Sequence, residues 1–298
     1  MTNAYKGSGK PYRGRIAPTP SGLLHVGHAR TFWMAWYRSR ISGGTLIYRN
    51  EDLDPCRCKA NFTQAALEDM RWLGLNWEEG PDVGGGHQPY HQSERTSLYR
   101  ETLAHLQEKG HLYPCKRSRK ELREYAQDRG LDATDPVFPE MWRPEVGTNH
   151  FREGEEDCAW RFRVPYGRVI EFVDVNPDVG ATSFVAGKDF GDFVVWRRDN
   201  VPAYELAVVV DDVAMQVSEV VRGADLLVST ARQLLLYEAL GQMPPAFFHC
   251  PLLKDEEGRK LSKSLDSRSI EQHRASGVES QHWQEEFEAT YHEILAGS

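Results

Sequence analysis

The order of apolar and polar positions at the start of the chain predicts strand, helix, strand and helix in succession. An apolar run at residues 12–17 ends in the turn formers of residues 18–22, and helical apolar spacing follows from about Gly27 through Tyr37. Residues 45–49 predict a second strand, and residues 61–73 a second helix capped by Asn61. Strands that alternate with helices predict a parallel sheet with crossover helices.

The middle of the chain departs from this pattern. Residues 78–89 are rich in Gly and Pro and predict a loop, and residues 93–110 predict a helix. From about residue 115 to residue 191 the chain is rich in Pro and charged residues, with short β-like runs at 159–164 and 169–173. This change predicts a smaller α+β domain inserted into the α/β pattern.

After the insertion the α/β pattern resumes. Apolar runs recur at residues 193–197, 204–210, 218–221 and 247–253. A helix is expected over 230–240 and a polar loop over 254–264, and we interpret 204–210 as an extended segment. The acidic stretch 271–294 has helix-like apolar spacing and is expected to pack back on the body.

These patterns divide the chain into four parts. A doubly wound α/β catalytic domain is expected in two halves, at residues 11–114 and 192–270. The inserted domain occupies 115–191, and a short tail occupies 271–298. A chain of 298 residues fits a prior of about 150 residues per domain.

Composition excludes several classes of protein. A hydrophobic fraction of 40% with 27% charged residues is that of an ordinary globular protein, not of a disordered or collagen-like chain. No stretch reaches the roughly 18 apolar residues of a membrane span, and the first residues have no apolar core of a signal peptide. We therefore expect a cytoplasmic protein with no membrane partner.

The charge balance restricts how the chain could bind nucleic acid. With 36 basic and 44 acidic residues, the net charge of −8 disfavours non-specific coating of nucleic acid. Residues 111–130 are an exception, with six Lys or Arg against three acids. Two interpretations stay open: a solvated helix face with i,i+4 ion pairs, or a local basic face for a nucleic acid.

Two short segments suggest chemistry on a phosphate. His25 and His28, with Gly27 between them, stand at an expected helix start, where free N–H groups attract phosphate and Gly27 permits close approach. Lys260 and Lys263 lie in a polar loop and could hold a departing pyrophosphate. Each segment alone could be an ordinary surface feature, but their occurrence together in one α/β chain makes coincidence unlikely.

Several longer segments carry a family resemblance: RIAPTPSGLLHVGHAR, RNEDLDP, AYELAVVVDD, EVVRGADLLVSTARQLLLYEALG and KLSKS. Together they resemble the class I aminoacyl-tRNA synthetases, and among them the glutamyl type. The resemblance implies a Rossmann-like catalytic domain that binds ATP through His25, Gly27, His28 and Lys263, with Mg²⁺ accompanying the ATP. It also implies catalytic roles for His25, His28, Lys260 and Lys263.

A glutamate pocket follows from residue chemistry and from the resemblance together. Arg15 and Arg222 offer forked donors to carboxylates, and Glu51 could pair with the ammonium group. Tyr204 and Thr19 add hydroxyl groups near the same ends of the strands, where doubly wound sheets bind ligands. The glutamate-binding positions of the family map onto these five residues.

Three acidic residues of the same region leave questions open. Asp211 and Asp212 could help to hold magnesium or adenosine, or could be structural. Glu205 follows Tyr204 where relatives typically have Asn, and it could point into the pocket or away from it.

The cysteines predict no structural zinc site. The five cysteines are expected to be reduced, and they lack the spacing of four zinc ligands. The family often has a C-x-C, a Tyr and a further Cys in the inserted region, but here Cys115 is followed by Lys116 and Arg117. Tyr125 and Cys158 do not restore the spacing, so no zinc is expected.

Chain length points to one branch of the family. Few residues follow the KLSKS segment, too few for the large anticodon-binding domain of a complete glutamyl-tRNA synthetase. A core of this kind resembles the glutamyl-queuosine tRNA(Asp) synthetases. That resemblance implies an enzyme that activates L-glutamate with ATP and transfers it to queuosine in the anticodon of tRNA(Asp). We expect a monomer. The alternatives are a truncated synthetase that charges a tRNA 3′ end and a nucleotidylyltransferase of the same superfamily.

Overall fold

Four short parallel strands form the centre of the protein. The structure is a computed structural model that describes residues 11–145, 158–252 and 268–296. In it β1 (Arg13–Ile16) pairs in parallel with β2 (Thr45–Tyr48), and β8 (Glu219–Gly223) pairs in parallel with β9 (Ala246–Cys250). A hydrogen bond of 2.9 Å from the Ser218 backbone N–H to the Arg13 carbonyl brings the two pairs alongside each other.

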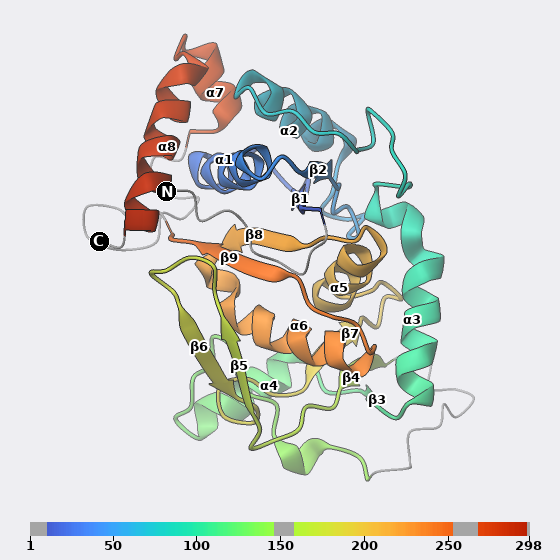
Figure 1. Cartoon of the computed structure of the whole chain (residues 1–298). Helices are drawn as coiled ribbons and strands as arrows, with labels where there is room; N and C mark the ends of the chain where they lie inside the picture. Colours follow the sequence, from blue (N-terminus) through green and yellow to red (C-terminus); the bar gives the residue numbers. More distant parts are fainter. Residues whose placement is uncertain (1–10, 146–157, 253–267, 297–298) are drawn as a thin grey trace.

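Helices cover both faces of these strands (Figure 1). On one face lies α1 (Val26–Ile41), with α2 (Ala60–Trp72) nearby, and on the other lie α5 (Tyr204–Ala214) and α6 (Leu227–Ala239). This arrangement of parallel strands and crossover helices confirms the expected α/β class. A further helix, α3 (Thr96–Glu108), packs against α5.

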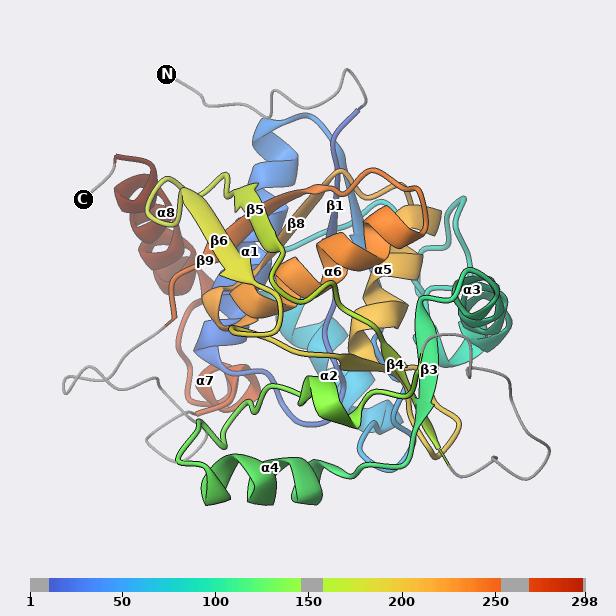
Figure 2. The ribbon, with the colours of Figure 1, turned by 90° about the horizontal axis from the view of Figure 1, so that it is seen from below.

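The lower part of the molecule in Figure 1 is antiparallel. Its three-stranded sheet has the order β3–β4–β7, and β5 and β6 form a separate hairpin. The bounds of these strands are β3 (Leu112–Cys115), β4 (Ala159–Phe162), β5 (Val169–Val173), β6 (Ala181–Val185) and β7 (Phe193–Trp196). Seen from below, α4 (Arg119–Asp128) runs along one edge of the molecule (Figure 2).

The segment 115–191 shares its hydrophobic core with the catalytic part. Trp160 and Ile170 belong to the same buried cluster as Val209 and Leu236. Strand β7 lies beyond residue 191 and still pairs with β4. The segment is therefore packed into the rest of the fold, and the four domain boundaries stay a prediction.

Two expectations from the sequence were wrong. Lys59 is the N-cap of α2, and Asn61 lies inside the helix, which begins one residue earlier at Ala60. The segment expected to be extended at 204–210 is helix α5, which is buried on nearly all sides. A short apolar run suits a buried strand and a buried helix equally well, because neither needs a polar face.

The tail packs on the body, as its apolar spacing predicted. It forms α7 (Ile270–Ala275) and α8 (Ser280–Ala296). Arg38 of α1 donates to the Tyr291 hydroxyl over 2.9 Å, and the rings of Trp33 and Phe287 lie 6.3 Å apart. No helix in the described ranges is long and apolar enough to cross a membrane.

Candidate active site

Arg15 and Arg222 lie at the carboxyl ends of adjacent strands, β1 and β8. Both are nearly buried, with exposed fractions of 5% and 4%. Arg15 donates to the Val221 carbonyl over 2.8 Å, and its Nε makes no hydrogen bond within the described part of the chain. Arginines with donors to spare in an enclosed site are suited to bind a carboxylate.

The Arg222 guanidinium is held on three sides. Its Nη1 donates to Gln233 Oε1 over 2.8 Å, its Nη2 to Thr230 Oγ1 over 2.7 Å, and its Nε to His249 Nε2 over 3.2 Å. A guanidinium has five N–H donors, so two remain without a hydrogen-bond partner among the residues described. Arg222 is thus fixed in direction and still has donors available.

Thr19, Glu51 and Tyr204 line one cavity close to these arginines. Burial raises the pKa of Tyr204, and the charges of Arg222, Glu51 and Arg15 all act on its hydroxyl. Burial also raises the pKa of Glu51, against the opposing charge of Arg49. The structure therefore gathers the five residues that the sequence predicted for a glutamate pocket.

Beneath the pocket lies a buried charge network that the sequence did not reveal. Arg49 is fully enclosed and reaches three carboxylates: Glu51 at 3.0 Å, Asp212 at 2.7 Å and Asp211 at 3.8 Å. Asp211 also accepts from Arg95 Nε over 2.6 Å. Because both carboxylates already pair with buried guanidinium groups, the structural interpretation of Asp211 and Asp212 is favoured over a role in holding magnesium or adenosine. The available signal for Arg49 was its place in RNEDLDP, two residues before Glu51.

Glu205 faces the cavity as well. It lines the cavity, accepts from Ser229 Oγ over 2.8 Å and from Gln233 Nε2 over 2.9 Å, and lies 3.8 Å from Arg232 Nη1. Burial raises its pKa, and Arg232 opposes that shift. Of the two directions that the sequence left open, Glu205 takes the one toward the cavity. Gln233 hydrogen-bonds both Glu205 and Arg222, so Glu205 helps to hold Arg222 in place through Gln233.

The two predicted histidines stand at the start of α1. His25 is the N-cap, and its Nδ1 accepts from the Gly27 backbone N–H over 3.1 Å. The His25 and His28 rings are stacked, with centroids 3.7 Å apart. The first turn of α1 carries no acidic residue, so its N–H groups offer a phosphate site without an opposing charge.

The chain on both sides of the predicted lysine loop is held next to α1. Before the loop, the Arg30 guanidinium donates to the Pro251 carbonyl. After it, the Ile270 N–H donates to the Leu24 carbonyl over 2.8 Å, and Ser269 forms a β-bridge with His25. Lys260 and Lys263 themselves lie outside the described residues.

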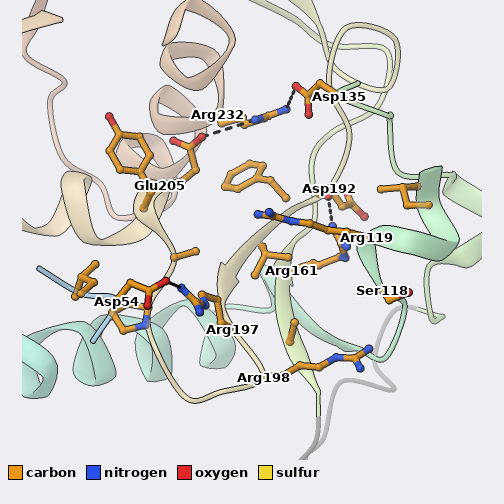
Figure 3. Close-up of a pocket in the computed structure, with 18 of the residues that line it drawn as sticks. Asp54, Ser118, Arg119, Asp135, Arg161, Asp192, Arg197, Arg198, Glu205 and Arg232 are labelled. Carbon is orange, nitrogen blue, oxygen red and sulfur yellow. Dashed lines mark hydrogen bonds and ion pairs between the residues drawn. The ribbon is translucent and has the colours of Figure 1, made fainter. Parts of the chain in front are cut away.

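The cavity that Thr19, Glu51 and Tyr204 line is large, with a volume of about 920 Å³ (Figure 3). Its wall carries eight arginines: Arg57, Arg117, Arg119, Arg123, Arg161, Arg197, Arg198 and Arg232. Five carboxylates face them: Glu51, Asp54, Asp135, Asp192 and Glu205. In Figure 3, Glu205 and Arg232 lie toward one side, and Arg161, Arg119 and Arg198 toward the other. The balance of charge on this wall is positive, although the whole chain is acidic.

The basic run at 111–130 forms the ion pairs of the first interpretation, and the nucleic-acid face of the second stays a prediction. It holds two i,i+4 ion pairs, Arg117–Glu121 at 3.0 Å and Lys120–Glu124 at 3.7 Å. It also contributes Arg117, Arg119 and Arg123 to the cavity wall. Sequence reasoning missed Arg197 and Arg198, although an adjacent pair of arginines just after a buried strand was a usable signal.

No group of three or more His, Cys, Asp or Glu side chains suited to a metal ion is present in the described ranges. Cys115 and Cys158 are buried at the β3–β4 pair, where Cys115 is opposite Ala159. Arg117, at the second position of the family's C-x-C, lies over the Trp142 ring, 4.7 Å from its centroid. The expectation that the protein binds no zinc stays a prediction.

Comparison with known proteins decides the family. The model of the catalytic domain of class I tRNA synthetases (E and Q) matches residues 12–285. The chain belongs to this family. Residues 12–285 include both strands that carry Arg15 and Arg222, the start of α1 and the arginine-lined cavity.

Relatives of this class I synthetase domain fall into two groups. The Glutamyl-Q tRNA(Asp) synthetase of Symbiobacterium thermophilum is 47% identical, over 89% of this chain and 82% of that protein. The Glutamate–tRNA ligase 2 of Syntrophus aciditrophicus is 40% identical, but the match covers only 55% of that protein. A crystal structure of a glutamate tRNA ligase from Elizabethkingia meningosepticum matches with a TM-score of 0.74 and 31% identity, over 85% of this chain and 52% of that one. The chain thus spans about half the length of these glutamate ligases.

Proposed function

We propose that this synthetase domain activates L-glutamate with ATP and transfers it to queuosine in the anticodon of tRNA(Asp). The observation that carries the proposal is the gathering of two buried arginines, Arg15 and Arg222, next to Tyr204, which lines an arginine-rich cavity together with Glu51. The 44–47% identity to two Glutamyl-Q tRNA(Asp) synthetases supports the choice of acceptor. We further propose that it works in the cytoplasm as a monomer.

In the pocket, Arg15 and Arg222 would bind the carboxylates of glutamate, and Glu51 its ammonium group. Thr19 and Tyr204 would donate hydrogen bonds from the cavity side. Glutamine would bind poorly, because its amide N–H groups would face arginine donors and leave a buried cation badly paired. This pocket would therefore select a dicarboxylate.

The first reaction would join glutamate to the nucleotide. The α-carboxylate oxygen attacks the α-phosphorus of ATP, and the bond to the bridging oxygen breaks so that pyrophosphate leaves. His25, Gly27 and His28 would hold the phosphates at the start of α1, and Lys260 and Lys263 would stabilise the departing pyrophosphate. Magnesium would neutralise phosphate charge as it accompanies ATP. No protein nucleophile is needed, because position and charge stabilisation supply the catalysis.

In the second reaction a hydroxyl of the acceptor base would attack the carbonyl carbon of the glutamyl adenylate, and AMP would leave. The acceptor must then reach the glutamate pocket through a space that tolerates phosphates. The cavity that Glu51 and Tyr204 line is large enough for a nucleotide, and its positive wall suits a polyanion.

The decisive experiment transfers labelled glutamate to tRNA(Asp) with and without queuosine and then maps the labelled nucleotide. We expect label on the anticodon base only when queuosine is present. The transfer should continue when periodate has destroyed the 3′ terminal diol of a tRNA whose queuosine was protected from the reagent. Glutamate-dependent pyrophosphate exchange without tRNA should accompany it, far faster than with glutamine. Equal exchange with both amino acids would refute the pocket.

A second candidate function is charging of a tRNA 3′ end, favoured by the 36–40% identity to glutamate–tRNA ligases. Label on the terminal adenosine would establish it and exclude the queuosine acceptor. Nucleotidyl transfer without any amino acid would point instead to a nucleotidylyltransferase.

A further inference from the structure

His249 of β9 is fully buried directly behind Arg222. Its Nε2 lies 3.2 Å from Arg222 Nε and 3.0 Å from Thr230 Oγ1, and its Nδ1 contacts Asp174 Oδ2. The exposed fractions of His249 and Asp174 are 0% and 4%. The imidazole thus connects Asp174, just after β5 in the segment 115–191, to an arginine of the parallel sheet.

The contacts determine which ring nitrogen carries the proton. The Nε of an arginine can only donate, so His249 Nε2 must offer a lone pair to Arg222. The proton then sits on Nδ1, which donates to Asp174 Oδ2. Burial lowers the pKa of His249, Asp174 opposes this shift, and the charges of Arg222 and Arg15 add to it, which keeps the ring neutral.

The loop after β5 fixes the two oxygens of Asp174 in different roles. Oδ1 accepts from the Asn176 backbone N–H over 2.8 Å and from the His249 backbone N–H over 3.1 Å. Oδ2 is left for the His249 ring. The loop itself is clamped to β9, because Asn176 Nδ2 donates to the His249 carbonyl over 2.6 Å and the Val175 N–H donates to the Phe247 carbonyl over 2.8 Å.

We propose that Asp174 and His249 are positioning residues that set the direction of the Arg222 guanidinium for the carboxylate of the amino-acid substrate. Asp174 holds His249 in the Nδ1–H tautomer, and the lone pair on Nε2 then holds the Nε edge of Arg222. The other edge of the guanidinium keeps its free donors for the ligand. This inference rests on the proposed function, in which Arg222 binds glutamate.

The sharpest variant is Asp174→Asn. Two backbone N–H donors face the Oδ1 position, so the amide oxygen of the new side chain must occupy it. The amide NH₂ then faces His249 Nδ1, which can only accept from it, and the ring proton moves to Nε2. Two donors, His249 Nε2–H and Arg222 Nε–H, would then oppose each other. Asn has the same shape as Asp, so the substitution preserves the fold, but it leaves His249 in the wrong tautomer and impairs activity.

Two further variants separate the ring nitrogens. In His249→Gln the side-chain amide reaches the former Nε2 position and can present its oxygen to Arg222. In His249→Asn the amide reaches only the former Nδ1 position, so the contact to Arg222 is lost. Asn176→Ser is the matched control, because it weakens the clamp between the loop and β9 without touching the imidazole.

The kinetic readout is the KM for glutamate and the kcat of pyrophosphate exchange. We expect Asp174→Asn and His249→Asn to raise this KM roughly 10–100-fold with little change in kcat, and to reduce the preference for glutamate over glutamine. His249→Gln should stay within about threefold of wild type, as expected for a retained hydrogen bond. Asn176→Ser should lower the melting temperature and leave the KM unchanged.

A second readout does not depend on the substrate. ¹⁵N NMR of histidine-labelled protein, with the His249 signals assigned by their loss in His249→Gln, should show the Nδ1–H tautomer in wild type and the Nε2–H tautomer in Asp174→Asn. Any of three results would overturn the positioning role. The first is an Nε2–H tautomer in wild type, and the second is an unchanged KM for glutamate in Asp174→Asn. The third is a KM shift in Asn176→Ser as large as the shift in Asp174→Asn. If wild type shows the expected tautomer but no glutamate-dependent pyrophosphate exchange, the proposed function is wrong. The hydrogen bonds from Asp174 through His249 to Arg222 would then be confirmed, but glutamate would not be the ligand of Arg222.

Discussion

Two regions of the molecule hold their arginines in different ways. Under the glutamate pocket, Arg15, Arg49 and Arg95 are buried among the carboxylates of Glu51, Asp211 and Asp212. Around β4 and α4, the guanidinium planes lie over aromatic rings. Arg143 is 3.7 Å from the Tyr166 centroid, and Arg161 is 4.3 Å from that of Phe138.

The difference follows from the ligand that each region is proposed to take. A carboxylate partner occupies the N–H edge of a guanidinium and fixes its direction, which suits a small substrate that needs one geometry. A ring partner occupies only the face, so the N–H edge can bind an acceptor at the same time. Arg143 forms an ion pair with Asp192, and Arg161 donates to the Asp192 carbonyl over 2.8 Å. Arg117 on the cavity wall combines the two kinds of contact, because it lies over the Trp142 ring and its Nη1 pairs with Glu121 at 3.0 Å.

The largest effect is expected in the buried network. Arg49→Met would leave Asp211 and Asp212 short of a partner at a site with no exposure, and removal of one partner from a buried ion pair typically costs about 3–5 kcal/mol. Urea unfolding should show this loss of unfolding free energy. Arg40→Met is the matched control, because the Arg40–Glu78 pair is exposed and should contribute less than about 1 kcal/mol. Equal losses would contradict the comparison.

The next effect separates the two reactions. Changing Arg119 and Arg123 to Ala removes two cavity-wall cations from α4 and should slow glutamyl transfer to tRNA roughly tenfold near physiological salt, while pyrophosphate exchange stays unchanged. The dependence of tRNA affinity on salt should weaken by about 0.7–0.9 in log slope for each lost phosphate contact. Lys120→Ala is the control, because this lysine is 84% exposed on the same helix and absent from the cavity wall. An equal slowing of glutamyl transfer in Lys120→Ala would indicate that the overall positive potential of α4, and not the arginines of the cavity wall, attracts the tRNA.

The contrast between the regions also shows what the sequence could predict. The proximity of Arg15 and Arg222 was predictable because both stand at strand ends, in motifs that carry the family pattern. The cavity wall was only half predictable. Arg119 and Arg123 lie in a visible basic run. Arg161 and Arg232 lie in mainly apolar segments instead, and only the tertiary packing brings them together. Helix α5 was misassigned because burial on all sides erases helical periodicity.

The third prediction tests whether aromatic packing or a bound metal ion stabilises the region around α4. Trp142 contacts Arg117, Phe138 and Tyr125, the last two with centroids 5.7 Å and 4.8 Å away. Trp142→Leu should lower the unfolding free energy by about 1–2 kcal/mol, through lost ring and cation–π contacts.

The companion measurement is metal content. Elemental analysis of protein purified without chelator should find far less than one zinc per chain, and EDTA should not shift the melting temperature. Arginine stays cationic and has no free lone pair, so Arg117 cannot replace a zinc ligand. Stoichiometric zinc bound through Cys115, or a chelator effect larger than that of Trp142→Leu, would show that a metal holds the region.

The smallest effect concerns a buried carboxylate outside both regions. Asp69 of α2 is fully buried, and burial raises its pKa to about 6, although Arg274 Nη2 lies 3.7 Å from Oδ1. The usual unfolded value is about 3.9, so the folded state favours the protonated acid. The penalty for the ionised form is therefore absent below about pH 4, grows between pH 4 and 6, and is complete above pH 6.

Asp69→Asn should accordingly stabilise the protein by about 1 kcal/mol at pH 7.5, a rise in melting temperature of roughly 2–4 °C for a chain of this size. At pH 4 the difference should shrink toward zero, since wild-type Asp69 is then largely protonated in the folded protein. Melting curves of both proteins across this pH range measure it. Unlike the paired carboxylates around Arg49, Asp69 has a single distant cation, Arg274, among the residues described, and its negative charge destabilises the folded protein. A stabilisation that does not change with pH, or a loss of stability at pH 7.5, would mean that the Arg274 contact outweighs the cost of burial.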